Sequence, residues 1–258
     1  VVLMPDSFED DIIGMAQKIV GSVTLGSGQF CTNPGLQIVL NTPESIQLID
    51  EVFKIMSSMN PGVLLNEAVQ SGLEKSVQLT VAHEEVELLT GGRKGSDDSI
   101  AFENTVLKTS ARSFLEDKSL QREHFGPAVL YVVCNSFDEV LEVISTLDGN
   151  LTATIFTNDQ NNEQIRQLVH QIREICGRLI MNGFPTGVEV CYAMTHGGPY
   201  PATTAPQTSS VGYTAIRRFI RPISFQNMDA ALLPEELLDS NPRNIWRIVD
   251  GASTNERI

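Results

Sequence analysis

Residues 128–182 read AVLYVVCNSFDEVLEVISTLDGNLTATIFTNDQNNEQIRQLVHQIREICGRLIMN and alternate short apolar runs with amphipathic segments. The apolar runs have the length and the β-branched content of buried strands. They are Ala128–Cys134, Leu151–Thr157 and Arg178–Asn182. Two predicted helices separate them, one from the capping box Ser136-Phe137-Asp138-Glu139 to Leu147 and one over Asn161–Ile175. Strands that alternate with helices of about ten to fifteen residues need crossover connections, so this stretch predicts a largely parallel, buried sheet.

The preceding residues continue the same alternation. Strands are predicted over Val1–Met4, Leu36–Leu40 and Val86–Leu89, the last closed by Gly91-Gly92. Helices are predicted over the apolar repeat Ile12–Val23 with Asp6 or Ser7 as N-cap, from Thr42-Pro43 to about Met59, and over Asn66–Val81. Together these elements predict an α/β fold in which a largely parallel sheet lies between two helical layers, a three-layer αβα domain.

The composition changes after Asn182. Residues 183–212 are rich in Gly, Pro, Thr and Ser, which is typical of loops, and Tyr213–Gln226 is predicted to form one long strand. That strand is either an arm that pairs outside the core or an ordinary edge strand of the same domain. Short helices are predicted over Leu232–Leu238 and over Pro242–Val249, with Asn241 as cap. We therefore expect a main domain over residues 1–205 and a C-terminal strand arm and tail over residues 206–258.

The composition limits the possible partners. The net charge of −14 over 258 residues argues against a nucleic-acid partner, which requires clustered Lys and Arg. No run of about 18 apolar residues is present, so we expect no membrane span. The four cysteines show neither CxxC spacing nor a nearby histidine pair, which argues against a metal site. The sequence shows no secretory signal, which argues against disulfides. We expect a cytoplasmic protein without a bound metal.

The chain opens on the buried-type strand Val1-Val2-Leu3-Met4, without an initiator Met or a polar lead-in. Domains rarely begin in this way. We therefore expect the sequence to be a piece of a longer chain.

The first motif that could carry chemistry is GSGQFCTNPG, residues 26–35. Cys31 lies there on a glycine-flanked turn between a predicted helix and a strand, where ligands can approach the backbone closely. An exposed cysteine can act as a nucleophile once its pKa is lowered, although the preceding helix C-terminus disfavours the thiolate. Composition alone favours a structural thiol.

The second motif is EHFGP, residues 123–127, immediately before the predicted strand Ala128–Cys134. A carboxylate at a strand entrance, such as that of Glu123, can accept hydrogen bonds from the hydroxyls of a sugar. Taken alone, Glu123 is more simply a surface acid, and Gly126-Pro127 a simple turn.

In this order, GQxC followed roughly ninety residues later by ExFGP resembles the aldehyde dehydrogenase superfamily. The resemblance covers essentially the whole chain and implies NAD(P)-dependent oxidation of an aldehyde to the acid. It identifies Cys31 as the nucleophile that forms a thiohemiacetal and then a thioester, with its backbone N–H in the oxyanion hole. It also assigns Glu123 to the nicotinamide-side ribose and Phe125 to the nicotinamide. The cofactor, NAD or NADP, would be held mostly by an N-terminal half, and the full-length protein is expected to be a homo-oligomer.

A narrower resemblance rests on FCTNPG (30–35), HGGPYPATT (196–204) and IWR (245–247). These segments are similar to 2-ketoglutarate semialdehyde dehydrogenases and to some NADP-linked long-chain aldehyde dehydrogenases. The resemblance implies substrate contacts from Phe30 and from the loop Phe184–Thr204, with Phe184 and Pro185 as the candidate residues, although that loop could equally be a structural connector. The family's phosphate-binding loop, side-chain oxyanion Asn and general-base Glu have no counterpart in this sequence. We therefore expect the chain alone to be inactive.

Two alternative functions stay open at this stage. The first is a cysteine-dependent hydrolase that uses Cys31 with a histidine base. The candidate bases are His83, His124, His170 and His196, none of which has a local signature. The second alternative is a non-catalytic assembly module in which Tyr213–Gln226 is the pairing arm.

Overall fold

A computed structural model describes residues 1–95 and 100–258 of the chain. Within it, the chain forms two compact units, Val1–Arg218 and Phe219–Ile258. The first unit extends past the domain boundary predicted at residue 205, and the functional division at that point stays a prediction. In the described ranges, no helix is long and apolar enough to cross a membrane.

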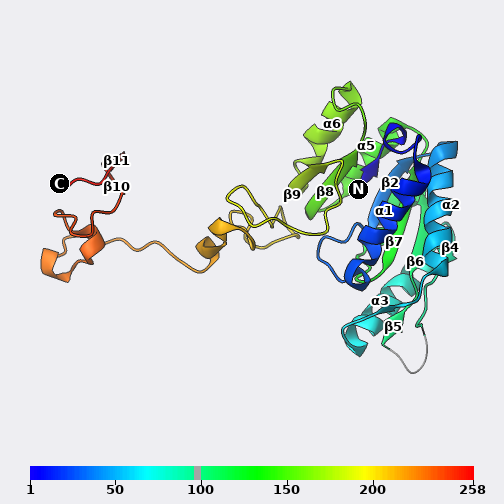
Figure 1. The fold of residues 1–258 in the computed structure, drawn as a ribbon, viewed down its shortest axis with the longest axis horizontal. Coiled ribbons are helices and arrows are strands. Elements are labelled where there is room, and N and C mark those ends of the chain that lie inside the picture. The colour runs from blue at the N-terminus through cyan, green and yellow to red at the C-terminus, as the bar shows by residue number, and fades with distance from the viewer. Residues whose placement is uncertain (96–99) are drawn as a thin grey trace. The chain divides into compact units, whose positions relative to one another are not determined.

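A seven-stranded sheet forms the centre of the first unit (Figure 1). Its strands are β1 (Val2–Leu3), β2 (Leu36–Leu40), β4 (Glu87–Thr90), β6 (Thr105–Ser110), β7 (Ala128–Cys134), β8 (Asn150–Phe156) and β9 (Cys176–Met181). They lie in the order β4-β6-β7-β2-β1-β8-β9, and every neighbouring pair is parallel except β4 with β6. The prediction of a largely parallel sheet is confirmed.

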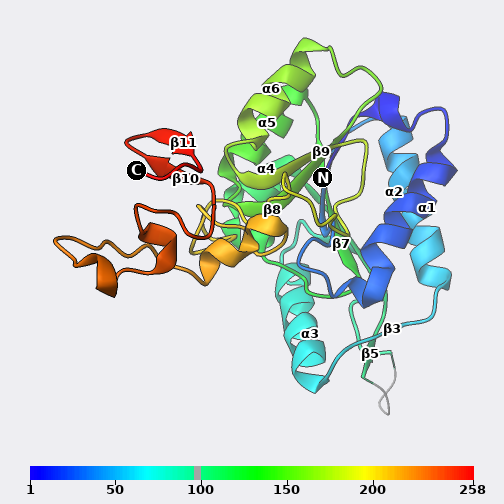
Figure 2. The ribbon, with the colours of Figure 1, turned by 60° about the vertical axis from the view of Figure 1, so that its left-hand side comes forward.

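Helices cover both faces of this sheet (Figure 2). The helices α1 (Ile12–Thr24) and α2 (Pro43–Ser58) pack on one face, and α4 (Ala111–Glu116), α5 (Phe137–Thr146) and α6 (Glu163–Ile172) pack on the other. Successive strand residues serve opposite faces: Val39 packs with α1 and α2, whereas Ile38 packs with the helices of the other layer. The strands are therefore apolar on both sides, as buried parallel strands are.

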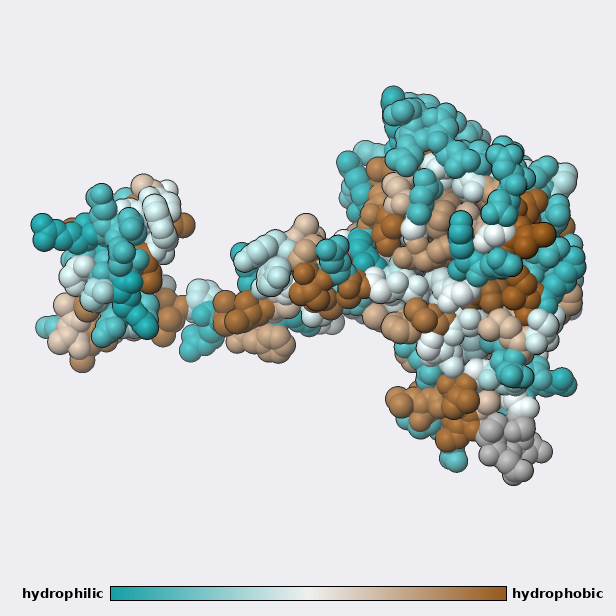
Figure 3. All heavy atoms as spheres, viewed as in Figure 1, coloured by the Kyte–Doolittle hydropathy of each residue, from teal (hydrophilic) through white to brown (hydrophobic). Residues whose placement is uncertain are grey.

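A smaller apolar cluster lies at one end of the unit. It joins α3 (Glu67–Val81) to the short pair β3 (Gly62–Val63) and β5 (Ala101–Phe102) through Leu73, Val77 and Phe102. Figure 3 shows apolar side chains gathered on the surface at this end, where Val63 and Leu65 are exposed. This cluster holds α3 against the segment that carries the EHFGP motif.

The helix starts predicted at Thr42 and Asn66 are confirmed, whereas the N-cap predicted for α1 is wrong. Thr42 and Asn66 accept hydrogen bonds from the backbone N–H groups of the third residues of their helices, as N-caps do. The N-cap of α1 is Asp11 rather than Asp6 or Ser7. The Asp6 carboxylate instead accepts hydrogen bonds from residues 157–159 at the end of β8, so it is not available to cap a helix.

The strand predicted over Tyr213–Gln226 is wrong. Tyr213–Arg218 forms a 3₁₀ helix, and no β-strand follows it before residue 247 in the described chain. The apolar residues that suggested the strand include Ile216 and Phe219, which are three positions apart and do not follow the two-residue period of a strand. Both side chains are exposed, and no strand among the described residues supplies hydrogen bonds to this segment.

The second unit contains short elements only. Two single-turn 3₁₀ helices form here: Glu235–Leu237 lies within the helix predicted over Leu232–Leu238, and Ala230–Leu232 overlaps it only at Leu232. The helix predicted over Pro242–Val249 is wrong: β10 (Arg247–Val249) and β11 (Ala252–Thr254) form a hairpin. Its two turn residues, Asp250 and Gly251, both have positive φ, and Asp-Gly is a strong hairpin signal that outweighs the helical pattern.

Candidate active site

Cys31 lies on an irregular turn between α1 and β2. A single 3₁₀ turn, Leu25–Gly28, follows α1, and the backbone takes positive φ at Gly26, Ser27 and Gly28. This reversal leaves the Cys31 side chain exposed, whereas Cys134 is fully buried. The Cys31 backbone N–H makes no hydrogen bond within the described chain, so it is available to a bound oxyanion.

The two sequence motifs meet backbone to backbone. A Cβ atom added at Gly28 would lie 2.0 Å from the carbonyl oxygen of Gly126, so only glycine allows this approach. The Asn33 side-chain amide spans the contact by donating to the carbonyl oxygens of Gly28, at 3.2 Å, and of Gly126, at 2.9 Å. The cysteine loop and the EHFGP segment therefore form one structure, although they are far apart in the sequence.

Gln29 attaches the cysteine loop to a third segment. Its side-chain oxygen accepts a hydrogen bond from the Leu65 backbone N–H at 2.8 Å, and its amide nitrogen donates to the Gly26 carbonyl at 3.1 Å. Gln29 thus braces the turn that exposes Cys31. The sequence pattern alone gave this residue no role.

A cavity of about 520 Å³ opens beside Cys31. Its walls include Phe30, Cys31, Glu123, Phe125, Pro201 and Ala202. The Glu123 side chain is exposed, and the Phe125 ring is 38% exposed. The structure therefore brings together four of the six predicted site residues: Cys31, Glu123, Phe125 and Phe30. The volume lies in the range of small-molecule sites.

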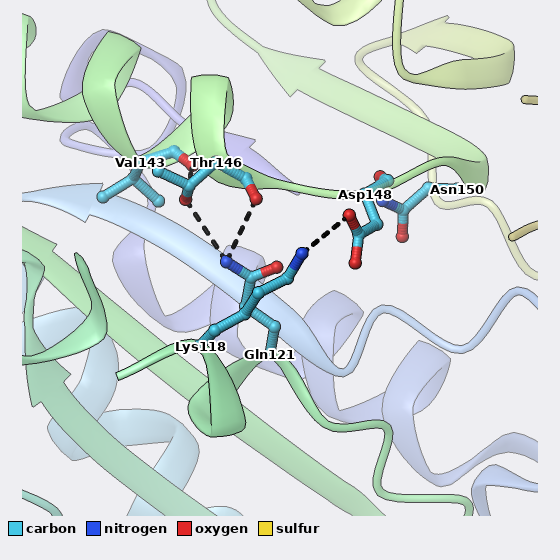
Figure 4. A network of polar contacts seen from close by, with 6 residues as sticks. All are labelled: Lys118, Gln121, Val143, Thr146, Asp148 and Asn150. Carbon is cyan, nitrogen blue, oxygen red and sulfur yellow. Dashed lines mark hydrogen bonds and ion pairs between the residues drawn. The ribbon is translucent and has the colours of Figure 1, made fainter. Parts of the chain in front are cut away.

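A network of polar contacts joins Lys118 and Gln121, which precede Glu123 in the chain, to residues at and after the end of α5 (Figure 4). The Gln121 amide donates to the carbonyl and hydroxyl oxygens of Thr146 at the end of α5, at 3.2 and 3.3 Å. One turn earlier, the Lys118 ammonium pairs with Asp148 at 3.0 Å, and the Asn150 amide donates to the Asp148 carbonyl. These contacts tie the 3₁₀ turn Lys118–Gln121 to the loop between α5 and β8, and residues of both segments line the cavity.

His196 contacts the cysteine. Its Nε2 lies 3.3 Å from Cys31 Sγ, although the two residues are 165 positions apart in the sequence. The loop that carries His196 packs closely on β9, where a Cβ added at Gly177 would lie 2.3 Å from the Gly197 carbonyl oxygen. The Ser209 hydroxyl accepts a hydrogen bond from the His196 backbone N–H at 2.9 Å. No local signature of a catalytic base marks His196, although it opens the segment HGGPYPATT on which the narrower resemblance rests.

The electrostatics of the chain favour a neutral His196 imidazole and disfavour the thiolates of Cys134 and Cys176. Burial, reinforced by the positive charge of Arg178, lowers the pKa of His196 from its ordinary value of 6.5. Burial raises the pKa of Cys134 to about 12 and also raises that of Cys176. Both of these thiols are thus held in the protonated form, which is unreactive.

Phe184 and Pro185 lie elsewhere. The Phe184 ring packs against Phe156 with ring centroids 4.9 Å apart, on the core side of α1 and α2. Pro185 is buried, and its carbonyl oxygen accepts a hydrogen bond from the Arg178 guanidinium at 2.6 Å. Neither residue is among those that line the cavity beside Cys31. Their role in substrate binding stays a prediction, which this placement does not favour over a structural one.

No cluster of three or more potential metal ligands occurs among the described residues. The fold and the site together define an α/β protein with an exposed thiol at the edge of a ligand-sized cavity. A model of the aldehyde dehydrogenase family matches residues 7–200, and the chain belongs to that family.

Two curated relatives match nearly the whole chain. Alpha-ketoglutaric semialdehyde dehydrogenase 2 of Azospirillum brasilense is 38% identical over 97% of this chain and 48% of the relative. Alpha-ketoglutaric semialdehyde dehydrogenase of Acinetobacter baylyi is 33% identical over 98% of this chain and 48% of the relative. The chain therefore spans about half the length of these relatives.

Solved structures share the fold at lower identity. A mutant of the Thermus thermophilus 1-pyrroline-5-carboxylate dehydrogenase aligns with a TM-score of 0.68 at 19% identity, over 85% of this chain and 41% of that one. The lactaldehyde dehydrogenase of Escherichia coli aligns with a TM-score of 0.67 at 20% identity, over 85% of this chain and 45% of that one. These similarities support the αβα architecture.

Proposed function

We propose that this chain is the cysteine-bearing half of an NAD(P)-dependent enzyme that oxidises an aldehyde to a carboxylic acid. The observation that carries the proposal is the placement of Cys31, Glu123 and Phe125 around one cavity. The substrate that we propose is 2-ketoglutarate semialdehyde. Both curated relatives that match nearly the whole chain carry the name of this semialdehyde.

Cys31 is the nucleophile in this proposal. The neutral His196 imidazole lies within reach of Sγ and accepts the thiol proton at Nε2. The thiolate then attacks the aldehyde carbonyl carbon, and the Cys31 backbone N–H donates a hydrogen bond to the developing oxyanion. The product of this step is a thiohemiacetal, a species bonded to Cys31 through sulfur.

The residues along the cavity suit a nicotinamide cofactor. Glu123 presents an exposed carboxylate that can accept hydrogen bonds from ribose hydroxyls, and Phe125 presents part of its ring to the same space. When bound, the cofactor supplies the oxidising power that converts the thiohemiacetal to a thioester by taking up a hydride. Water then hydrolyses the thioester and releases the acid from Cys31. A solved structure that shares this fold contains nicotinamide adenine dinucleotide, which supports the assignment.

The full-length protein provides the test. Formation of NADH or NADPH from 2-ketoglutarate semialdehyde is followed by absorbance in the wild type and in Cys31→Ser. The matched control is Cys191→Ser, which removes a thiol that does not line the cavity. We expect turnover in the wild type and the control but none in Cys31→Ser. Turnover by Cys31→Ser at the wild-type rate would show that Cys31 is not the nucleophile.

Cysteine-dependent hydrolysis is a second candidate, because the contact between Cys31 and His196 is the pair such an enzyme needs. His196→Gln separates the two functions, with His170→Gln on the exposed side of α6 as control. A hydrolase loses all ester turnover in His196→Gln, whereas the dehydrogenase that we propose slows but still reduces the cofactor.

We also propose that the full-length protein is a cytoplasmic homo-oligomer. All four cysteines are free, which fits a reducing compartment. The exposed apolar side chains of residues 213–225 fit an interface in the assembled protein.

A further inference from the structure

His124 occupies the second position of the EHFGP motif and is buried between two exposed neighbours. Its side chain is 7% exposed, whereas Glu123 and Phe125 on either side are exposed. The side chains of residues 123–125 therefore alternate between exposed and buried, and the buried His124 still contributes to the wall of the cavity. A buried polar ring at this position requires hydrogen-bond partners.

Those partners come from one face of α3. The Ser76 Oγ lies 2.7 Å from His124 Nδ1, and Thr80 Oγ1, four residues further along the helix, lies 3.4 Å from His124 Nε2. Ser76 and Thr80 are themselves buried. The Ser76 hydroxyl also donates to the backbone carbonyl of Glu123 at 2.9 Å.

This arrangement fixes the tautomer of His124. A serine hydroxyl has one proton, and Ser76 gives it to the Glu123 carbonyl. The Ser76 oxygen must then accept the proton of His124 Nδ1–H, which leaves Nε2 as the acceptor for the Thr80 hydroxyl. Burial lowers the pKa of His124 to about 4, in agreement with a neutral ring at neutral pH.

We infer that His124 is a positioning residue for the cofactor: through Ser76 and Thr80 it anchors the backbone of residues 123–125 to α3 and so directs Glu123 and Phe125 into the cavity beside Cys31. The inference rests on the proposed function of Glu123. It does not place His124 in contact with substrate or cofactor. Loss of the anchor lets Glu123 and Phe125 move, whereas Gly126 stays joined to the cysteine loop by Asn33, and Gln29 holds the turn beside Cys31.

Three substitutions in the full-length protein test the anchor. Asparagine carries an amide N–H near the position of Nδ1 and can still donate to Ser76, whereas glutamine and leucine cannot donate from that position. We expect the KM for the cofactor to rise about tenfold in His124→Gln and His124→Leu and to stay near wild type in His124→Asn. The KM for the aldehyde and the alkylation rate of Cys31 should change little in all three.

Further variants keep the result interpretable. Ser76→Ala removes the acceptor of Nδ1–H and should raise the cofactor KM by itself, with no further rise when it is combined with His124→Leu. His83→Asn is the matched control, since His83 also binds a hydroxyl, that of Ser119, but does not line the cavity. Nitrogen NMR of the His124 ring should show the proton on Nδ1, and a proton on Nε2 would overturn the assigned tautomer.

Glu123→Gln separates the possible failures. If Glu123→Gln raises the cofactor KM and the His124 and Ser76 variants do not, the positioning role of His124 is wrong while the proposed function stands. If Glu123→Gln changes neither the cofactor KM nor kcat, the proposed role of Glu123 is wrong. The positioning role inferred for His124 is then wrong as well. An equal rise of both KM values in His124→Gln and His124→Asn would mean a general loss of structure and would also overturn the inference.

Discussion

Gly28 and Gly126 touch through their backbones, so that the loop bearing Cys31 and the loop bearing Glu123 have no room for a side chain between them. The contact joins two segments that lie far apart in the sequence. Gly28 also has φ +69°, a conformation that other residues adopt only with strain.

Gly28→Ala should therefore destabilise the protein and displace the cysteine loop. The added methyl group meets the Gly126 carbonyl, and the positive φ adds strain, so we expect a loss of at least about 2 kcal/mol in the free energy of unfolding. Denaturant unfolding measures the loss. Gly21→Ala is the control, because Gly21 lies in α1 with nothing within 4 Å of an added Cβ and should be neutral or slightly stabilising. Equal stability of the two variants would contradict the close approach.

Cys31 should be the first of the four thiols to react with an alkylating reagent. It is exposed, whereas burial raises the pKa values of Cys134 and Cys176 and keeps them protonated. Limited alkylation followed by peptide mapping gives the order of labelling. Preferential labelling of Cys134 or Cys176 would count against the assignment of Cys31 as nucleophile.

The stability of the fold should fall in mild acid because of His124. Its pKa is lowered from 6.5 to about 4 in the folded chain, so between these pH values the unfolded chain binds a proton that the folded chain does not. Stability is therefore retained above the ordinary pKa and falls as the pH drops toward the lowered one, by up to about 3 kcal/mol from this group.

His124→Asn removes this titration without removing the hydrogen bond to Ser76. Denaturant unfolding of both proteins from about pH 4 to about pH 7 should give a flatter dependence for the variant. Parallel curves would show that His124 is not the buried neutral histidine described above.

The 258-residue chain alone should not oxidise aldehydes with either cofactor. Glu123 offers one or two hydrogen bonds to a ribose, at about 1 kcal/mol each, which is too little to hold a dinucleotide. An oxyanion that keeps the Cys31 N–H but lacks a side-chain donor loses roughly 10²–10³ in rate. Cofactor absorbance with short, long and dicarboxylate-type aldehydes is the assay, repeated after a separately expressed N-terminal half is added. Turnover by the chain alone would contradict this division of the site.

Residues 213–258 should contribute to assembly of the full-length protein. Phe219 and Ile223 are 85% and 64% exposed, and a second subunit can cover these apolar side chains. Deletion of residues 213–258 should lower the mass measured in solution. A truncated full-length protein that keeps its oligomeric state would refute the role of this segment.

The sequence predicted the elements whose signals are local. Leu36–Leu40 and Ala128–Cys134 form strands with the predicted bounds, because runs of apolar residues bounded by turns specify buried strands wherever they pack. The N-caps at Thr42 and Ser136 could also be predicted from the sequence, because capping involves residues only three positions apart.

The errors concern segments whose conformation depends on a partner or on turn chemistry. The strand predicted over Tyr213–Gln226 lacks a neighbour to pair with in the described chain, and β-propensity alone does not supply one. Asp250-Gly251 is a hairpin signal in the sequence, and the helix predicted over Pro242–Val249 did not take it into account.

The site was predictable only in part, because its two motifs are local and its third component is not. Cys31 and Glu123 stand in motifs that family resemblance identifies, and the structure places both at one cavity. The approach of His196 to Cys31 depends on the packing of a long coil on β9, for which no spacing rule exists.

The position of β1 in the sheet has a consequence for the order in which the fold can form during synthesis. Val2 and Leu3 are made well before β8, which begins at Asn150, yet they pair on one side with β2 and on the other with β8. Until β8 emerges from the ribosome, β1 presents an unpaired edge to any extended chain nearby. The growing polypeptide must therefore keep this edge covered while the intervening residues are made, and a pause in translation before Asn150 would lengthen the time in which it can aggregate.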